Sequence, residues 1–362
     1  MPAPRSDHLD FALLLDGRLS DSGSSTVWSP HSVAYALGTL AAGARGGTRA
    51  ELTRLLGAKP REHLAALDDA VADGPELAAG TGLWVREELP LNPGFEAELR
   101  QTPGAAVHTA DFHNDAEGAR HTINADVARA TRGMITELLT SGTVTAATQA
   151  LLVNALWVRL RWRHPFDPGR TAPAVFHAPS GDHRTPMMRY TGRLPHSHTA
   201  GWRMVTLTGE HELALDLLLP DDTTGFPPRL EHDALTALYE RSSPTEVELT
   251  LPRFEAAQRA ELSGPLAGCG VRTVFGDRAD LSGVSEVPLR IDEVIHQARL
   301  RVDEHGAEGA AATAVAMQLA AVTRSRPVVF RADRPFRFVL RRRSSVLFLG
   351  TVAAPRDPGT AE

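Results

Sequence analysis

The chain has 362 residues, of which 42% are hydrophobic and 23% are charged, and this ordinary globular composition supplies enough apolar material for a core. The formal net charge of −6 gives no indication of the basic surface that nucleic-acid or anionic-membrane partners require, so we expect neither partner. A single cysteine, Cys269, excludes an internal disulfide. The N-terminal residues contain no apolar signal segment, and no run of about 20 apolar residues predicts a membrane span. We expect a cytoplasmic protein, or a secreted one whose export segment has been removed.

The N-terminal part of the chain is dominated by helical patterns. Residues 9–19 predict a helix, and Ser29 followed by Pro30 predicts the N-cap and first turn of a second one. Thr48 is predicted to cap a third helix after a pair of glycines. Residues 60–140 are expected to be mostly helical, interrupted by extended pieces near 80–86 and 105–110.

From about residue 149 the pattern changes to strands. Residues 150–158 are nearly all apolar, which predicts a strand that is buried on both faces. Residues 246–251 and 296–303 alternate between apolar and polar, as half-buried strands do. Residues 336–352 predict two strands, and the three arginines at 341–343 are expected to form a solvated turn between them. Helices followed by many strands indicate an α+β fold, and the absence of a long linker indicates one domain over residues 1–362.

The segment 306–323 differs from the rest of the chain. Glu308 is its one charged residue, and small side chains dominate it. With a period of two, one face carries Ala307, Gly309, Ala311 and Thr313, all of them uncharged. Such a face could join a β-sheet without burying an unpaired charge, which would cost several kcal/mol. The residues alone leave two interpretations open: a strand that waits outside a sheet, or a flexible low-complexity loop.

Motifs along nearly the whole chain resemble the serpin family. Residues 301–314 resemble the hinge of inhibitory members, and residues 330–336 resemble the C-terminal signature. Further matches, in the family's order, are residues 28–33, 131–135, 152–167, 187–192 and 279–283. One such motif is a weak signal, but seven in order make the chain similar to an inhibitory, bacterial-type serpin.

This resemblance implies an α+β fold with three β-sheets, about eight or nine helices and an exposed reactive-centre loop at about residues 306–327. It implies an inhibitor and not an enzyme. In the implied mechanism, a target serine protease attacks the loop, and the cleaved loop then inserts into the large sheet and traps the covalent acyl-enzyme. The implied protein is a monomer without metal or cofactor. Because residues 60–80 mix acids and bases, we expect no heparin activation.

The resemblance assigns the hinge to eight consecutive residues: Gly306, Ala307, Glu308, Gly309, Ala310, Ala311, Ala312 and Thr313. Counting forward from Gly306 puts the residue before the scissile bond at Ala320, whereas counting back from Pro335 puts it at Ala321. We therefore predict cleavage between Ala320 and Ala321, with the bond after Leu319 as the runner-up. Small or medium apolar residues there suit elastase-like or subtilisin-like proteases, with chymotrypsin-like ones as a further alternative, because the first pocket of these enzymes is apolar.

The resemblance also assigns supporting residues. The family's shutter, a polar cluster beneath the large sheet that holds it closed but lets it open, is matched by Ser29, Ser32, Asn154 and His296. Because His296 lies on the apolar face of its alternating strand, the pattern alone predicts a buried histidine whose ring nitrogens are hydrogen-bonded locally. Trp162 matches the breach, where the loop first enters the sheet, although a large core aromatic would give the same pattern. Arg337 stands where the family prefers an apolar residue, which makes its strand unusual.

Three other functions compete with inhibition of serine proteases. The chain contains no nucleophile-elbow, zinc-protease or phosphate-loop motif, which argues against an enzyme. A non-inhibitory serpin, acting as a carrier, a chaperone or a plain protease substrate, tends to have charged or bulky residues or proline in its hinge. The inward hinge face of this chain has none. Inhibition of cysteine proteases stays open, because a thioester acyl-enzyme could be trapped by the same loop. Arg324 would suit a trypsin-like protease but lies too far downstream.

Overall fold

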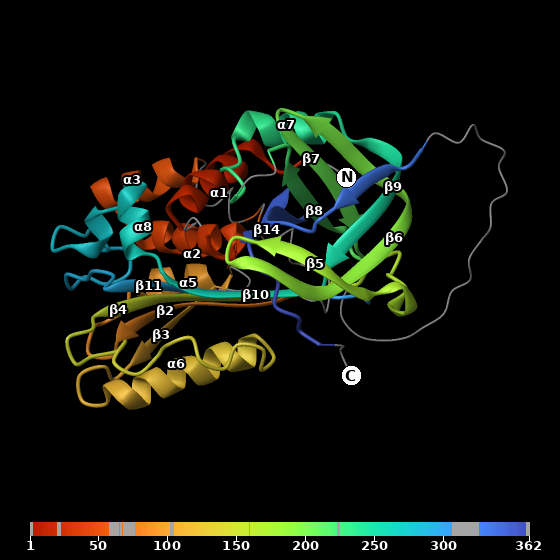
Figure 1. Cartoon of the computed structure of the whole chain (residues 1–362). Coiled ribbons are helices and arrows are strands. Elements are labelled where there is room, and N and C mark those ends of the chain that lie inside the picture. The colour runs from red at the N-terminus through yellow and green to blue at the C-terminus, as the bar shows by residue number, and fades with distance from the viewer. Residues whose placement is uncertain are drawn as a thin grey trace.

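The structure is a computed structural model that describes residues 3–19, 23–57, 65, 67, 77–101, 105–158, 160–222, 225–305 and 326–359. Its strands form a five-stranded sheet of order β10-β11-β4-β2-β3 and a nine-stranded sheet of order β1-β14-β13-β8-β7-β6-β9-β12, with β5 paired to β6 (Figure 1). The strands are β1 (Thr26–Trp28), β2 (Leu77–Arg86), β3 (Ala105–Ala110), β4 (Ala150–Val158), β5 (Ala172–Ala178), β6 (Gly181–Thr199), β7 (Trp202–Thr208), β8 (Leu213–Pro220), β9 (Ser243–Pro252), β10 (Phe254–Glu261), β11 (Glu293–Val302), β12 (Val328–Arg331), β13 (Phe336–Arg342) and β14 (Ser345–Val352).

The α-helices of the described residues are α1 (Ser6–Leu19), α2 (Pro30–Gly43), α3 (Gly46–Leu56), α5 (Pro93–Arg100), α6 (Ala116–Ala130), α7 (His232–Glu240) and α8 (Ser263–Gly268). This mixture confirms the expected α+β class. Strand β6 is 19 residues long and pairs with β5, β7 and β9, so two of the three expected sheets are continuous through it. None of the helices in the described ranges is both long and apolar enough to cross a membrane.

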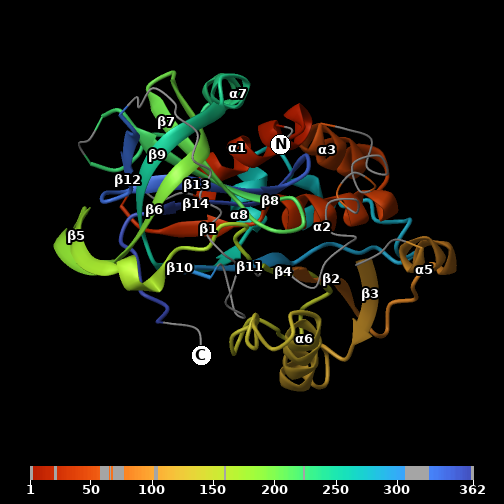
Figure 2. The same cartoon turned by 90° about the vertical axis from the view of Figure 1, so that its right-hand side faces the viewer.

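The five-stranded sheet lies between two helical layers (Figures 1 and 2). On one face lies α6, whose Ile123 and Val127 share a buried hydrophobic cluster with Leu151 and Val153 of β4. On the other face lies α2, and Leu152 of β4 belongs to the core on that side. Successive side chains of β4 therefore enter two different apolar layers, which explains its near-continuous apolar run.

The predicted extended pieces near 80–86 and 105–110 are confirmed as β2 and β3. The described part of residues 60–140 is not mostly helical, because α5 and α6 cover only 93–100 and 116–130 of it. One predicted cap is also wrong. Ser29 does cap α2, because its Oγ accepts the backbone N–H of Ser32 at 3.0 Å. Thr48 does not cap α3, which begins two residues earlier at Gly46. Thr48 is instead buried within the first turn, where its Oγ1 accepts the backbone N–H of Asp280 at 2.9 Å. The hydroxyl thus fixes a neighbouring loop.

The predicted solvated turn at residues 341–343 is wrong for two of its arginines. Arg341 and Arg342 are each 3% exposed, because β13 lies between β8 and β14. The Arg341 Nε donates to Oδ2 of Asp216 at 2.7 Å, and the Arg342 Nε donates to the carbonyl of His211 at 2.8 Å. A buried arginine is tolerated where such partners replace water, and a single sequence does not show partners that lie more than 100 residues away.

Arg337, which departs from the family pattern, is also buried, at 1% exposure. Its Nη1 donates to Oδ2 of Asp16 on α1 at 2.7 Å, and its Nε donates to the carbonyl of Pro228 at 2.8 Å. The Trp28 indole Nε1 donates to the other oxygen of Asp16 at 3.2 Å. The unusual charge is therefore matched by a buried acid, and the pair ties α1 to the nine-stranded sheet.

Candidate functional site

The two strands at the centre of the five-stranded sheet are parallel. β11 pairs with β4 from Glu293 opposite Leu151 to Leu300 opposite Val158, and we call this ladder the seam. The other neighbours of these strands, β10 and β2, are antiparallel to them. A segment that left the end of β11 and turned back would run antiparallel to both seam strands. It could therefore replace a parallel ladder, which is slightly less stable per residue, with two antiparallel ones.

The four predicted shutter residues lie together beneath the seam and are buried. His296 and Asn154 are register partners across the seam, and Nδ1 of His296 lies 2.7 Å from Oδ1 of Asn154. Nε2 of His296 accepts the backbone N–H of Ser29 at 3.0 Å. Nδ2 of Asn154 donates to the carbonyl of Ser32 at 2.9 Å. These contacts link β4, β11 and the start of α2 to one another.

The hydrogen bonds define the protonation state of His296. Because Nε2 accepts a backbone N–H, the proton of the neutral ring is on Nδ1, which donates to Asn154. Burial lowers the pKa of His296 to about 3, although its contact with Asn154 favours the protonated form. The ring is therefore neutral at physiological pH. A second proton would be placed on Nε2, where it would face the Ser29 N–H.

Thr81 joins this cluster, and sequence reasoning missed it. It lies on β2 opposite Asn154, and its Oγ1 accepts a hydrogen bond from Nδ2 of Asn154 at 2.8 Å. Both amide hydrogens of Asn154 are thus used, one by Thr81 and one by the Ser32 carbonyl. Thr81 stands between Gly80 and Gly82, and the two glycines conceal the alternation that would mark a buried strand face.

Trp162 lies beyond the C-terminal end of the seam and is 5% exposed. Its indole Nε1 donates to the carbonyl of Asp303 at 2.9 Å, and its backbone N–H donates to the carbonyl of His305 at 3.4 Å. The ring also meets Phe166 edge to face, with centroids 6.4 Å apart. Trp162 is therefore both a core aromatic and a contact of the residues that directly follow β11.

Glu304 is a second contact at this end of the seam, and it is 2% exposed. The single Nε–H of Arg253 is shared between the two carboxylate oxygens of Glu304, at N–O distances of 2.8 and 2.7 Å, and Nη2 of Arg253 lies 2.6 Å from Oε1. The hydroxyl of Thr171 also donates to Oε1 at 2.6 Å. Burial raises the pKa of the Glu304 carboxyl, but the hydrogen bonds from Arg253 and Thr171 outweigh it, and the net pKa lies below its usual range. Sequence reasoning missed this pair because its members lie 51 residues apart and leave no local signal.

Replacing Arg253 by alanine should destabilise the intact protein by about 3–4 kcal/mol, because the Glu304 carboxylate would stay buried with one hydroxyl partner. Equilibrium unfolding in urea measures this. The matched control is Arg129→Ala, which removes an arginine whose side chain is 76% exposed in its pair with Asp126 and should cost less than about 1 kcal/mol. Equal losses in the two variants would contradict the assigned importance of the buried pair.

The predicted hinge, Gly306 to Thr313, and the predicted scissile residues Leu319, Ala320 and Ala321 lie outside the described residues, so their assignments stay predictions. The described chain ends at His305 and continues at Arg326. Within the ranges that the structure describes, no group of three or more histidine, cysteine, aspartate or glutamate side chains is arranged to hold a metal ion.

Comparison with known proteins identifies the family. A family model described as serpin (serine protease inhibitor) matches residues 6–355. Serpin-Z2A of Oryza sativa subsp. japonica is 33% identical over 410 aligned residues, which cover 95% of this chain and 96% of the relative. The leukocyte elastase inhibitor of Sus scrofa is 33% identical over 376 residues, covering 95% and 97%. A solved structure of an Arabidopsis serpin in its native stressed conformation matches with a TM-score of 0.85 and 25% identity over 97% of each chain. The chain therefore belongs to the serpin family.

Proposed function

We propose that the chain is a suicide-substrate inhibitor of serine proteases. In this proposal a target protease cleaves the segment that follows β11 and stays attached to it as an acyl-enzyme. The severed segment then enters the five-stranded sheet between β4 and β11 and carries the protease with it. The inhibitor needs no catalytic residue, because the bond-breaking chemistry belongs to the protease.

One observation carries the proposal, namely the parallel seam between β4 and β11. A strand that follows β11 and turns back has the right direction to pair with both seam strands. Its entry would add backbone hydrogen bonds to the sheet and convert a parallel pairing into antiparallel ones. The alternating face of residues 307–317 carries no charge, so it could turn toward the core without burying one.

The contacts that cross the seam explain why the sheet would stay closed before cleavage. Opening separates His296 from Asn154, and each buried polar group left without a partner costs about 1–3 kcal/mol. An inserted strand supplies hydrogen-bond partners to the backbone of β4 and β11 only where it lies between them. The intact segment is tethered to β11 at one end and to β12 at the other, so cleavage is what would free it to fill the seam.

Mixing the protein with an elastase-like or subtilisin-like serine protease should give a covalent complex that survives denaturing electrophoresis. The expected complex has the summed mass of the protease and the inhibitor without its residues beyond the cut, and mass spectrometry of the released peptide locates the scissile bond. A protease whose catalytic serine has been replaced by alanine is the control, because it cannot acylate. If a broad panel of proteases yields only cleaved chain and fully active enzyme, the inhibitor proposal fails.

The same panel separates the alternatives. A carrier, a chaperone or a plain substrate would be cleaved without complex formation, and the family membership of the chain would still hold. Stable complexes with papain-like enzymes would instead indicate a cysteine protease inhibitor that uses the same insertion. The uncharged inward face of the hinge favours inhibition over a role as carrier, chaperone or plain substrate.

A further inference from the structure

The foot of the seam, just before the first paired residues of β4 and β11, is held closed by one carboxylate. Oδ2 of Asp292 accepts the backbone N–H of Gln149 at 2.5 Å and that of Ala150 at 3.1 Å. The backbone N–H of Asp292 donates to the carbonyl of Ala150 at 2.9 Å. Asp292 is thus bound to the beginning of β4 through both its side chain and its backbone. Hydrogen bonds to an ionised acceptor are stronger than those between neutral groups.

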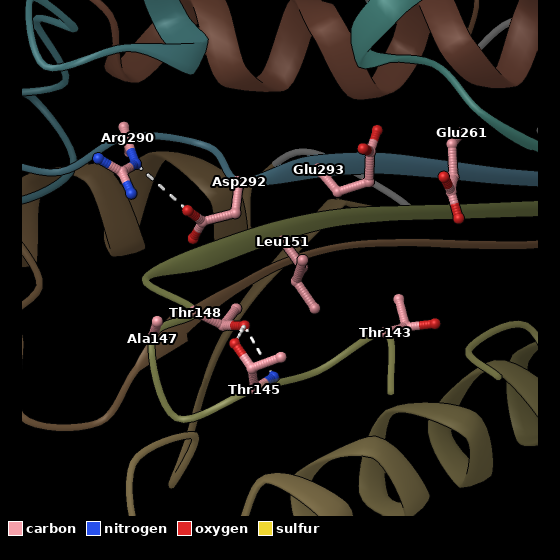
Figure 3. Close-up of a pocket in the computed structure, with 9 residues that line it drawn as sticks. All are labelled: Thr143, Thr145, Ala147, Thr148, Leu151, Glu261, Arg290, Asp292 and Glu293. Atoms are coloured by element: carbon pink, nitrogen blue, oxygen red, sulfur yellow. Dashed lines mark hydrogen bonds and ion pairs between the residues drawn. The ribbon is translucent and has the colours of Figure 1, made fainter. Parts of the chain in front are cut away.

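Arg290 holds this carboxylate in position. Its Nε donates to the other oxygen of Asp292 at 3.3 Å, and its Nη1 donates to Asp277 at 2.8 Å. The backbone N–H of Arg290 adds a contact to the side chain of Gln149 at 3.3 Å. Figure 3 shows the Arg290 and Asp292 side chains pointing toward one another. One oxygen of Asp292 is therefore held by the start of β4 and the other by Arg290.

A cavity of about 300 Å³ lies beside the carboxylate (Figure 3). One wall is the connection between α6 and β4, which contributes Thr143, Thr145 and Thr148. The opposite wall is the sheet, with Leu151 of β4 and Glu293 of β11. Hydroxyl and carboxylate groups stand on both walls, beside the apolar Ala147 and Leu151. These groups could hydrogen-bond to an extended backbone that passes beside the cavity.

The strand register shows which part of an inserted segment would reach this foot. If residue 307 pairs with the last residue of β11, an antiparallel segment places residue 316 opposite Glu293, the first residue of β11. Residues 317–320, which end at the predicted cut, must then pass Asp292. At about 3.3 Å per residue they would carry an attached protease about 13 Å further along the sheet.

We propose that Asp292 is a latch at the foot of the seam, and that its release from Gln149 and Ala150 determines how deep the severed segment inserts. This inference rests on the proposed inhibitory function. While the latch is closed, the segment stops at the end of the ladder. Once the latch opens, the backbone of residues 317–320 takes the place of Asp292 at the start of β4 and passes beside the cavity.

The test compares the melting temperatures of the intact and the loop-cleaved protein, at a fixed guanidinium concentration that brings both transitions into range. Cleavage of the wild type should raise the melting temperature markedly, because insertion completes the sheet. Asp292→Ala should lower the melting temperature of the intact form by about 2–5 °C and leave that of the cleaved form unchanged within about 1 °C. Amide exchange at Gln149 and Ala150 in the intact variant should become at least about tenfold faster.

Glu261→Gln is the matched control, because Glu261 lines the same cavity but has its ion pair with Arg259 on its own strand. Glu261→Gln should change the melting temperature of neither the intact nor the cleaved form. Asp292→Asn keeps an acceptor oxygen and should fall between the wild type and Asp292→Ala, which covers the case in which the alanine variant does not fold. Equal losses in both forms, or no loss in either, overturn the latch while leaving the inhibitor proposal intact. A wild type that gains no stability on cleavage overturns both proposals.

Discussion

Replacing Ala307 by arginine should convert the protein from an inhibitor into a substrate without unfolding it. Ala307 begins the uncharged face of the segment that follows β11, and the proposed insertion turns that face toward the core. An arginine there would have to be buried without a partner, at a cost of several kcal/mol. Insertion would slow by orders of magnitude, whereas hydrolysis of the acyl-enzyme would continue at its usual rate. We expect the number of inhibitor molecules consumed per protease inactivated to rise from near one to more than about ten.

The neighbouring position supplies the control. Glu308 falls on the opposite face because side chains alternate along a strand, and the register proposed for insertion places it opposite the partly exposed Arg301, so Glu308→Arg introduces the same side chain without full burial. This variant should inhibit as the wild type does, and both variants should keep the wild-type melting temperature before cleavage. Titration of a fixed protease concentration with each variant measures the number of inhibitor molecules consumed per protease inactivated. Unchanged inhibition by the Ala307 variant, or an equal failure of both variants, would contradict insertion through this face.

The sequence predicted those parts of the fold that have a local cause. The apolar run of β4 and the Ser29–Pro30 start of α2 each need only their own residues to be recognised, and both are confirmed. The interior of β13 could not be predicted in this way. Arg341 on β13 is kept in the core by Asp216 of β8, and pattern alone makes a run of arginines look solvated. Long-range pairing of buried charges is invisible to any reasoning that uses neighbours in the sequence.

The same distinction applies to the candidate site. Family motifs pointed to His296 and Asn154, which the structure brings to within hydrogen-bonding distance across the seam. They did not point to Thr81 or to Asp292. Thr81 acts through a register that only the paired strands define, and Asp292 acts through backbone N–H groups, which have no sequence signature. Residues that act through distant backbone groups are thus harder to find than residues that belong to a sequence motif.

Acid should weaken the intact protein through His296. The pKa of this ring lies at about 3 in the folded protein because of burial, against about 6.5 in an unfolded chain. The unfolded state therefore binds the proton first, so the contribution of His296 is fully present above about pH 6.5 and is lost as the pH falls toward 3. The slope is about 1.4 kcal/mol per pH unit, which amounts to about 4–5 kcal/mol across the window.

Urea unfolding of the wild type and of His296→Gln between pH 4 and 7 isolates the contribution of His296 to the free energy of unfolding. The stability difference between them should shrink by about 1.4 kcal/mol for each unit of acidification, because glutamine does not titrate. His164→Gln, at an exposed position, should leave the pH profile of the wild type unchanged. A difference that stays constant with pH would show that His296 is not held neutral. A second proton on Nε2 would face the Ser29 N–H, whereas Nδ1 would keep its hydrogen bond to Asn154, so the expected loss arises at the contact between β11 and the start of α2.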